Sequence, residues 1–260
     1  MKIYLGFDDT DTPDSDRGTG KLARWFENEM PDGCRCLGVV RQQLLVDENI
    51  PYTSHNSSAC VIADVPEPSY SETLVELAAR HVEKYFLEGS DPGICAVLED
   101  DPALNALTDY GRDCTCRVMS QKDALQAARS VHLSGHGGTN DGIIGAAAAV
   151  GLTAAGWYGR FIEFGRLRKL PDQMTVNQLE ALGIQVVSLD RDASIPKPDE
   201  VVMTNRWVRP RMLGQKPVLP VASAGKGVWE NIGRKRGRKQ AASPAHELQE
   251  LCNSAGSRRL

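Results

Sequence analysis

The stretch GFDDTDTPDSDRGTGKLARWF, residues 6–26, decides the fold of the first half of the chain, because a strand gives way to a helix within it. The run KIYLGF predicts a buried strand, and GKLARWFENEM predicts an amphipathic helix with Leu22, Trp25 and Phe26 on one side. Five aspartates lie between them, although a helix start needs only one as a cap. Close carboxylates repel one another, so this excess indicates a positive charge among them.

The composition is that of an ordinary globular protein, since 41% of the 260 residues are hydrophobic and 25% are charged. This length allows one large domain or two of medium size. A formal net charge of −4 gives no overall attraction to nucleic acid, so binding of RNA requires a local basic patch. No apolar run is long enough for a signal peptide or a membrane span. We therefore expect a cytoplasmic protein with reduced cysteines and no membrane partner.

Two C-x-C pairs stand out among the seven cysteines, Cys34/Cys36 and Cys114/Cys116. If the two pairs converged, four thiolates could bind zinc. However, the usual C-x-x-C spacing of zinc sites is absent, and small buried thiols are common in protein cores. The default prediction is therefore that these cysteines belong to the core, and zinc binding is the alternative.

Strand and helix patterns alternate through the first half of the chain. CRCLGVVRQQLLV, SSACVIADV and PGICAVLED predict strands. SETLVELAARHVEKYFLEG predicts a helix that is capped by Ser71 and ends at Gly89. The polar segment DPALNALTDYGRD predicts irregular structure, so we place a domain boundary near residues 110–116.

Beyond that boundary, SQKDALQAARS and TVNQLEALG predict helices, and YGRFIEFGRLR and IQVVSLDRD predict strands. This alternation suits a small ferredoxin-like α+β unit. We therefore predict an α/β (α+β) fold of two packed domains, residues 1–112 and 113–222, with the ligand site in the cleft between them. The composition changes after residue 222, and we predict that residues 223–260 form a basic, mobile tail.

The first candidate site consists of Asp8, Asp9 and Asp11, at the carboxyl end of the first predicted strand. Ligand sites of open α/β sheets lie at such ends. Mg²⁺ commonly binds one or two carboxylates together with substrate phosphates, so these residues suit a magnesium–phosphate site. The alternative is an acidic loop in solvent in which one Asp caps the helix.

The segment DRGTGK, which follows, adds groups that suit a phosphate. Gly18 and Gly20 lack side chains, which lets backbone N–H groups at the helix start approach an anion. Lys21 adds a positive charge at the same place. The spacing differs from that of a Walker motif.

Two further polar stretches are candidates for ligand contact. IPYTSHNSSAC contributes His55 and Asn56, although a turn held by its own hydroxyl groups explains the same residues. SGHGGTNDGIIGAAAAVG precedes an Ala-rich helix whose start suits an anion. Its alternative is a glycine-rich connector in which one Asp caps a buried helix. The candidate residues of this last stretch are Gly137, Gly138, Thr139, Asn140 and Asp141.

GFDDTD, RGTGKLA, IPYTSHNSSA and GGTNDGIIGAAAAVG, in that order, resemble the archaeal tRNA-isoleucine agmatinylcytidine synthetase family over roughly residues 1–222. The resemblance implies a kinase-like domain followed by a ferredoxin-like domain. It also implies ATP and Mg²⁺ as cofactors, phosphorylation of a cytosine carbonyl oxygen, and attack by the amine of agmatine. By this resemblance Asp8, Asp9 and Asp11 are the Mg–ATP carboxylates. We expect Asp8 and Asp11 to hold the metal, and Asp9 to join them or to orient the attacking group.

Three departures separate this chain from the family. The family's phosphoacceptor threonine lies in a Gly-x-Cys-Thr-Thr segment, whereas here the matching run is GTGK, so Thr19 and Lys21 become the catalytic candidates beside the aspartates. The family's Lys-Thr-Arg-Gly-Asn becomes TSHNS, which loses two positive charges. The family's OB-fold and zinc ribbon are expected to be missing. We therefore expect only weak binding of tRNA, through the basic residues Arg234, Lys235, Arg236, Arg238 and Lys239.

Two hypotheses follow. The first is an Mg–ATP-dependent phosphotransferase or amine ligase, with ATP and an amine such as agmatine or another small molecule as partners. The alternative is a non-catalytic module that binds a nucleotide or RNA. Whether the substrate is a small molecule or an RNA delivered by a partner chain stays open at this point.

Overall fold

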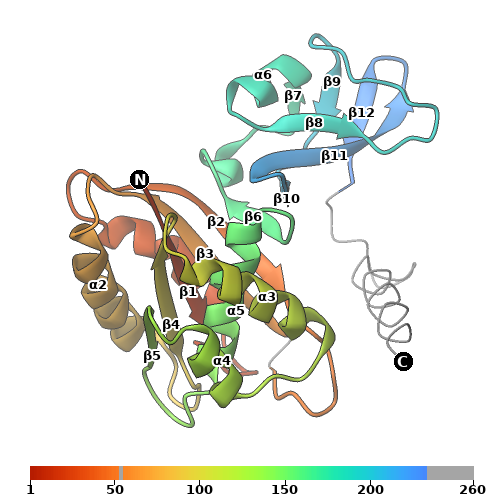
Figure 1. The fold of residues 1–260 in the computed structure, drawn as a ribbon. Coiled ribbons are helices and arrows are strands. Elements are labelled where there is room, and N and C mark those ends of the chain that lie inside the picture. Colours follow the sequence, from red (N-terminus) through yellow and green to blue (C-terminus); the bar gives the residue numbers. More distant parts are fainter. Residues whose placement is uncertain (53–54, 233–260) are drawn as a thin grey trace.

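The computed structural model describes residues 1–52 and 55–232. The strands of its first half are β1 (Lys2–Asp8), β2 (Arg35–Gln43), β3 (Ser57–Asp64), β4 (Gly93–Leu98), β5 (His132–Gly135) and β6 (Arg160–Glu163). They form an antiparallel sheet in the order β5-β4-β1-β3-β2-β6, as Figure 1 shows. In an antiparallel sheet the end of one strand lies beside the start of its neighbour, so loops from distant segments meet where β1 ends.

Helices cover both faces of this sheet. One face carries α1 (Thr19–Trp25), η1 (Phe26–Glu29) and α2 (Tyr70–Tyr85). The other face carries α3 (Ala103–Cys116), α4 (Gln121–Ala127) and α5 (Gly142–Ala155), and Figure 1 shows α2 opposite α3 and α5. Two apolar cores fill these layers, so the fold is mixed α/β, as predicted. None of these helices, nor any other among the described residues, is long and apolar enough to cross a membrane.

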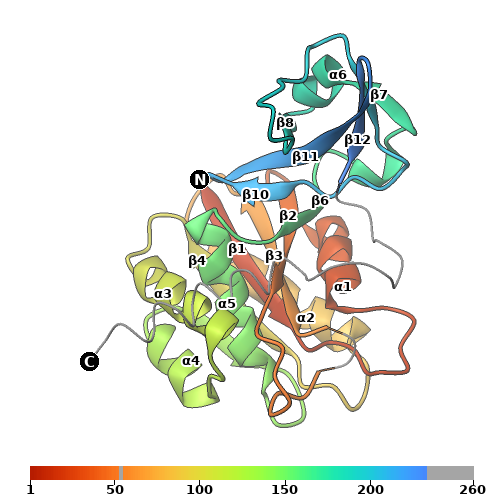
Figure 2. The same cartoon turned by 90° about the vertical axis from the view of Figure 1, so that its right-hand side faces the viewer.

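A second lobe follows β6 and continues the same sheet, as Figure 2 shows. Its elements are η2 (Leu167–Lys169), β7 (Gln173–Thr175), α6 (Val176–Ala181), β8 (Gln185–Ser188), β9 (Val201–Met203), β10 (Arg211–Leu213), β11 (Lys216–Gly225) and β12 (Val228–Asn231). The strand order from β6 is β10-β11-β12-β9-β7, and β8 pairs with β11. One residue pair, Arg160 with Arg211, joins β6 to β10.

The segment predicted to be irregular is the helix α3. Leu107, Tyr110 and Cys114 lie on its buried side, at the spacing of an amphipathic helix. The predicted boundary between residues 112 and 113 falls inside this helix. Moreover, β5 pairs with β4 and β6 pairs with β2. Residues 113–163 therefore share a sheet and a core with the first half, because those strands complete that sheet.

The C-terminal prediction is corrected in part. Residues 223–232 belong to β11, β12 and the turn after them, because their backbones pair within the second lobe. The rest of the predicted tail, with all of its basic residues named above, lies outside the described residues. The helix α2 begins at Tyr70, one residue before the predicted cap Ser71.

Glycines allow α5 to lie directly on the sheet. A Cβ atom at Gly6 of β1 would overlap the carbonyl oxygen of Ala146, and one at Gly93 of β4 would overlap the backbone of Gly142. Such close approach requires residues without side chains. It brings the N-terminal end of α5 to the place where β1 ends.

Candidate functional site

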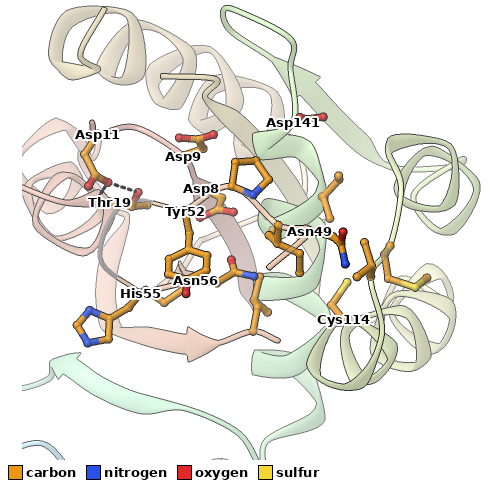
Figure 3. Close-up of a pocket in the computed structure, with 18 of the residues that line it drawn as sticks. Asp8, Asp9, Asp11, Thr19, Asn49, Tyr52, His55, Asn56, Cys114 and Asp141 are labelled. Atoms are coloured by element: carbon orange, nitrogen blue, oxygen red, sulfur yellow. Dashed lines mark hydrogen bonds between the residues drawn. The ribbon is translucent and has the colours of Figure 1, made fainter. Parts of the chain in front are cut away.

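The three polar stretches singled out in the sequence meet in one pocket of about 420 Å³, shown in Figure 3. The pocket opens where β1 ends, between the starts of α1 and α5. Nine of the predicted site residues line it: Asp8, Asp9, Asp11, Gly18, Thr19, Gly20, His55, Asn56 and Asp141. The predicted cleft therefore exists, although it lies at the edge of a shared sheet instead of between two domains.

Asp8 is the last residue of β1 and lies against the first turns of α5. A Cβ atom at Gly145 would overlap the Asp8 carboxylate, so the glycine leaves room for this group. Burial, and then the charge of Asp9, raises the pKa of Asp8 to about 8. Burial and a neighbouring carboxylate both disfavour the charged form of Asp8, and a bound cation would favour it. This carboxylate is therefore a suitable ligand for a cation.

Asp9 turns the chain away from the strand, because its φ of 50° lies in the left-handed region. Burial, and then the charge of Asp91, raises its pKa to about 6. The pKa values of Asp8 and Asp9 are thus both raised at this acidic end of the pocket. The physical cause is the same for both: desolvation combined with neighbouring carboxylates.

Asp11 caps α1. Its Oδ1 accepts hydrogen bonds from the Thr19 backbone N–H at 3.0 Å and from the Thr19 hydroxyl at 3.1 Å, drawn as dashed lines in Figure 3. The Thr19 Oγ1 in turn accepts from the Thr10 N–H at 3.3 Å. Gly18 stands at the N-cap position and has no side chain to cap the helix. Asp11 therefore does the capping from eight residues earlier in the chain.

Lys21 does not line the pocket. Its ammonium group lies 5.2 Å from the centroid of the Trp25 ring, four residues further along α1. That geometry is a cation–π contact on the helix surface. The expected point charge beside a phosphate is therefore not supplied by this lysine in the structure.

The glycine-rich stretch before α5 folds onto a residue that the sequence did not single out. The Asp91 carboxylate accepts from the Thr139 backbone N–H at 2.7 Å and from the Thr139 hydroxyl at 2.9 Å. A Cβ atom at Gly138 would overlap the same carboxylate. Gln121 donates to Asp141 at 2.6 Å. The close packing against Asp91 explains why position 138 is a glycine. Of residues 134–141, which precede α5, only Asp141 lines the pocket.

His55 and Asn56 lie on the opposite wall from Asp141 in Figure 3. The Asn56 side chain donates to the Leu45 carbonyl at 2.6 Å, and the Asn56 carbonyl accepts from Gln43 at 2.7 Å. Asn56 thus holds its loop against the end of β2. Asn56 lines the pocket, but its side-chain amide N–H and its backbone carbonyl already make hydrogen bonds within the protein.

The rest of the pocket lining was predicted only in part, since the stretch IPYTSHNSSAC begins with Ile50, Pro51 and Tyr52. It comes from the end of β2 and the loop after it, from the connection between α3 and α4, and from α5, and it contains Arg41, Leu44, Asn49, Ile50, Pro51, Tyr52, Cys114, Arg117, Val118, Met119, Ser120, Gln121 and Ile144. Much of this wall is apolar. The helical spacing of α3, which ends at this wall, is the one pattern in the sequence that could have indicated it.

Cys34 and Cys36 do not meet Cys114, so the two C-x-C pairs do not form one site. Cys34 and Cys36 pack with the core under α1 and α2, whereas Cys114 is buried in the core on the other face of the sheet. Within the described part of the chain, no group of three or more His, Cys, Asp or Glu side chains is arranged to hold a metal. A cation in the pocket would therefore need ligands from a bound molecule as well.

Fold and pocket together define a mixed α/β protein with a half-acidic, half-apolar ligand site. A crystal structure of a tRNA fluorescent labelling enzyme is similar to it, with 25% sequence identity and a TM-score of 0.50, over 58% of this chain and 36% of that one. The complex of TiaS with its isoleucine tRNA and ATP is similar in fold, with 23% identity and a TM-score of 0.50 over the same shares. No family model and no curated protein matches the chain.

These similarities confirm the predicted resemblance at the level of the fold. TiaS is an agmatidine synthetase for an isoleucine tRNA, the enzyme type that the sequence motifs resemble. The chain spans only about a third of the length of the proteins it matches. Their activities, substrates and partners are therefore starting points for a proposal about this chain.

Proposed function

We propose that this protein is an ATP- and Mg²⁺-dependent enzyme that modifies RNA, by phosphorylating a carbonyl-type oxygen that an amine then attacks. The observation that carries the proposal is the meeting of Asp8, Asp9 and Asp11 with the starts of α1 and α5 in one pocket. The starts of two helices favour anions, and the carboxylates favour a cation. An Mg²⁺-bound polyphosphate satisfies both.

The donor set fits a magnesium ion that is also bound by phosphates. Asp8 would hold the ion, with Asp11 or Asp9 as a second ligand, because Mg²⁺ usually takes one or two carboxylates and completes its shell with water and phosphate oxygens. When bound, the ion supplies neutralisation of the developing phosphate charge. The raised pKa of Asp8 supports this assignment, because burial and then the charge of Asp9 raise it, and a cation would offset both.

The protein's own groups then bind and orient the phosphates. The start of α1, at Gly18 and Gly20, and the first turns of α5, at Gly145, line the pocket, where the positive ends of the two helices favour an anion. Arg41 adds a guanidinium group from the wall that β2 contributes. The apolar wall with Met119 suits the flat ring of a base, because such surfaces bury ligand rings.

The substrate class rests on the similarity in fold and motifs. The related structures include a tRNA labelling enzyme and a complex with tRNA and ATP, which supports RNA as the substrate here. The amine is agmatine or another small amine in this proposal. The reaction places a phosphoryl group on the carbonyl oxygen, and the amine nitrogen then displaces that oxygen with phosphate as the leaving group.

A thermal-shift titration with Mg²⁺ and then ATP tests the site. Ligand at about a hundredfold excess over Kd contributes about 2.7 kcal/mol, which raises the Tm of a protein of this size by about 5–10 °C. Asp8→Asn should lose most of that shift. Asp14→Asn is the control, because Asp14 is exposed and outside the pocket. Equal shifts in Asp8→Asn and wild type would refute the site.

A non-catalytic nucleotide- or RNA-binding module is the second candidate, and two observations favour it. Lys21 lies against Trp25 outside the pocket, and the Thr19 hydroxyl is bonded to Asp11. An enzyme releases ADP or AMP from ATP when candidate amines and RNA are supplied, whereas a binding module releases neither. Product analysis therefore separates the two candidates even if the thermal shifts are the same.

A further inference from the structure

Three arginines lie side by side across three neighbouring strands. Arg41 of β2 pairs with Arg160 of β6, and Arg160 pairs with Arg211 of β10. Figure 2 shows these strands in the region where the first lobe meets the second. Side chains that are directly opposite on neighbouring strands have Cβ atoms about 5 Å apart, so the Cβ atoms of the three arginines span about 10 Å. We call these residues the arginine row.

The row lies on the face of the sheet that carries α1. Ile162 packs on that face, because a Cβ atom at Gly20 of α1 would be 3.0 Å from its Cδ1. Arg160 is two residues before Ile162 in the same strand, so both side chains point to the same face. Cross-strand partners share a face, which places Arg41 and Arg211 there too.

The charge of the row is not balanced from within the described part of the chain. None of the three guanidinium groups has a carboxylate within 4 Å there or a hydrogen bond to another described residue, whereas Arg117 at the same pocket pairs with Asp113. Burial, and then the charges of Arg211 and Arg41, lowers the pKa of Arg160. Like charges directly opposite on a sheet are destabilising. An anion from outside the chain would relieve this repulsion.

We propose that the arginine row binds the phosphodiester backbone of a single-stranded RNA segment and leads it into the pocket. Arg41 belongs both to the row and to the pocket wall, so an anion on the row is continuous with a ligand in the pocket. A compact anion would need one or two guanidinium groups, whereas three in a line match a chain of charges. The inference rests on the proposed function, since the pocket would take the base to be modified.

The test is equilibrium binding of a fluorescein-labelled RNA ten-mer to the full chain by anisotropy, at several salt concentrations. Each phosphate contact on a single strand contributes about −0.7 to the slope of log K against log salt. Arg160→Gln and Arg211→Gln should each reduce the slope by about 0.7, a loss of about fivefold in affinity at 0.1 M salt. Arg80→Gln is the matched control, because Arg80 is an exposed arginine on α2 that pairs with Glu76. Thermal melts of each variant confirm folding.

Two arms separate a strand from a free polyphosphate. Affinity for a strand should rise between a dinucleotide and the ten-mer, whereas inorganic triphosphate should compete only weakly. Unchanged slopes in both row variants, or equal competition by triphosphate, would overturn the row as an RNA track. ATP binding by wild type is measured in parallel. If ATP does not bind but the variants reduce the salt slope, the arginine row binds RNA and the proposed function is refuted. If ATP binds but the variants leave the slope unchanged, the proposed function is supported and the arginine row does not bind RNA.

Discussion

Gly145 of α5 and Asp8 of β1 compete for one volume: the Asp8 carboxylate occupies the space that a side chain at position 145 would fill. The acidic end of the pocket therefore depends on a missing methyl group on the neighbouring helix. This relationship separates the geometry of the carboxylate from its charge, because a substitution at Gly145 moves Asp8 without removing it.

Gly145→Ala should lower both stability and magnesium affinity. Forcing one methyl group into a closely packed site costs about 1–3 kcal/mol, and relief of the clash must displace Asp8. Gly151→Ala is the matched control, because a Cβ atom there would overlap the Leu107 carbonyl oxygen away from the pocket, so it should lower stability without lowering magnesium affinity. Chemical denaturation with and without Mg²⁺ measures both effects. Equal stability of Gly145→Ala and wild type would contradict the packing described above.

The stability of the ligand-free protein should fall between pH 5 and pH 8.5, in part because of Asp8. Its pKa is about 8 in the folded state, above the unfolded value of about 4. A group whose pKa is raised by folding contributes stability below the unfolded pKa, and this is lost as the pH rises through the folded pKa. Asp8→Asn should therefore melt above wild type at pH 8, with a smaller difference at pH 5. A difference that does not depend on pH would contradict the raised pKa.

Asp91→Ala should loosen the loop before α5. The carboxylate receives two hydrogen bonds from Thr139, and loss of such bonds costs about 1–3 kcal/mol. Hydrogen exchange in peptides that cover residues 135–141 should then accelerate about tenfold or more. Asp192→Ala is the control, because Asp192 makes the same pair of bonds to Ser194 in the second lobe. Unchanged exchange in residues 135–141 would mean that Asp91 does not hold the loop.

Thr19→Val should destabilise the protein, whereas Thr19→Ser should not. The hydroxyl is buried, donates to Asp11 and accepts from Thr10, so its removal takes this acceptor from the buried Thr10 N–H and hydroxyl. Denaturation measures the stability of both variants. Intact-mass analysis after incubation with Mg–ATP tests the catalytic assignment of Thr19 at the same time. A phosphoryl group on wild-type Thr19 would establish that assignment.

The sequence predicted the elements that follow a regular pattern and missed those that do not. The buried run of β1 and the Ala-rich α5 were predicted, because each is apolar over its whole length. The helix α3 was missed because polar residues outnumber the buried positions Leu107, Tyr110 and Cys114, although these recur at helical spacing. A domain boundary was placed inside it as a result.

The site could be predicted only where its residues are close in the sequence. Asp8, Asp9 and Asp11 form a cluster that the chain itself displays. Arg41 reaches the same region from β2, and Asp91 reaches it from the loop before β4, and nothing in their immediate neighbours indicates it. The side chain of Lys21 was misplaced because its direction depends on the rotation of α1, which the spacing of DRGTGK does not determine.

Because Asp11 caps α1, the hydrogen bonding at the start of this helix should change when an ion binds in the pocket. The Asp11 Oδ1 receives both the N–H and the hydroxyl of Thr19, so an ion that drew this oxygen away would have to compete with the first turn of the helix. Binding of the ion at Asp11 would then be coupled to fraying of the first turn of α1. The backbone amide of Thr19 should exchange with solvent faster as such an ion is added, even while the rest of the protein becomes more rigid.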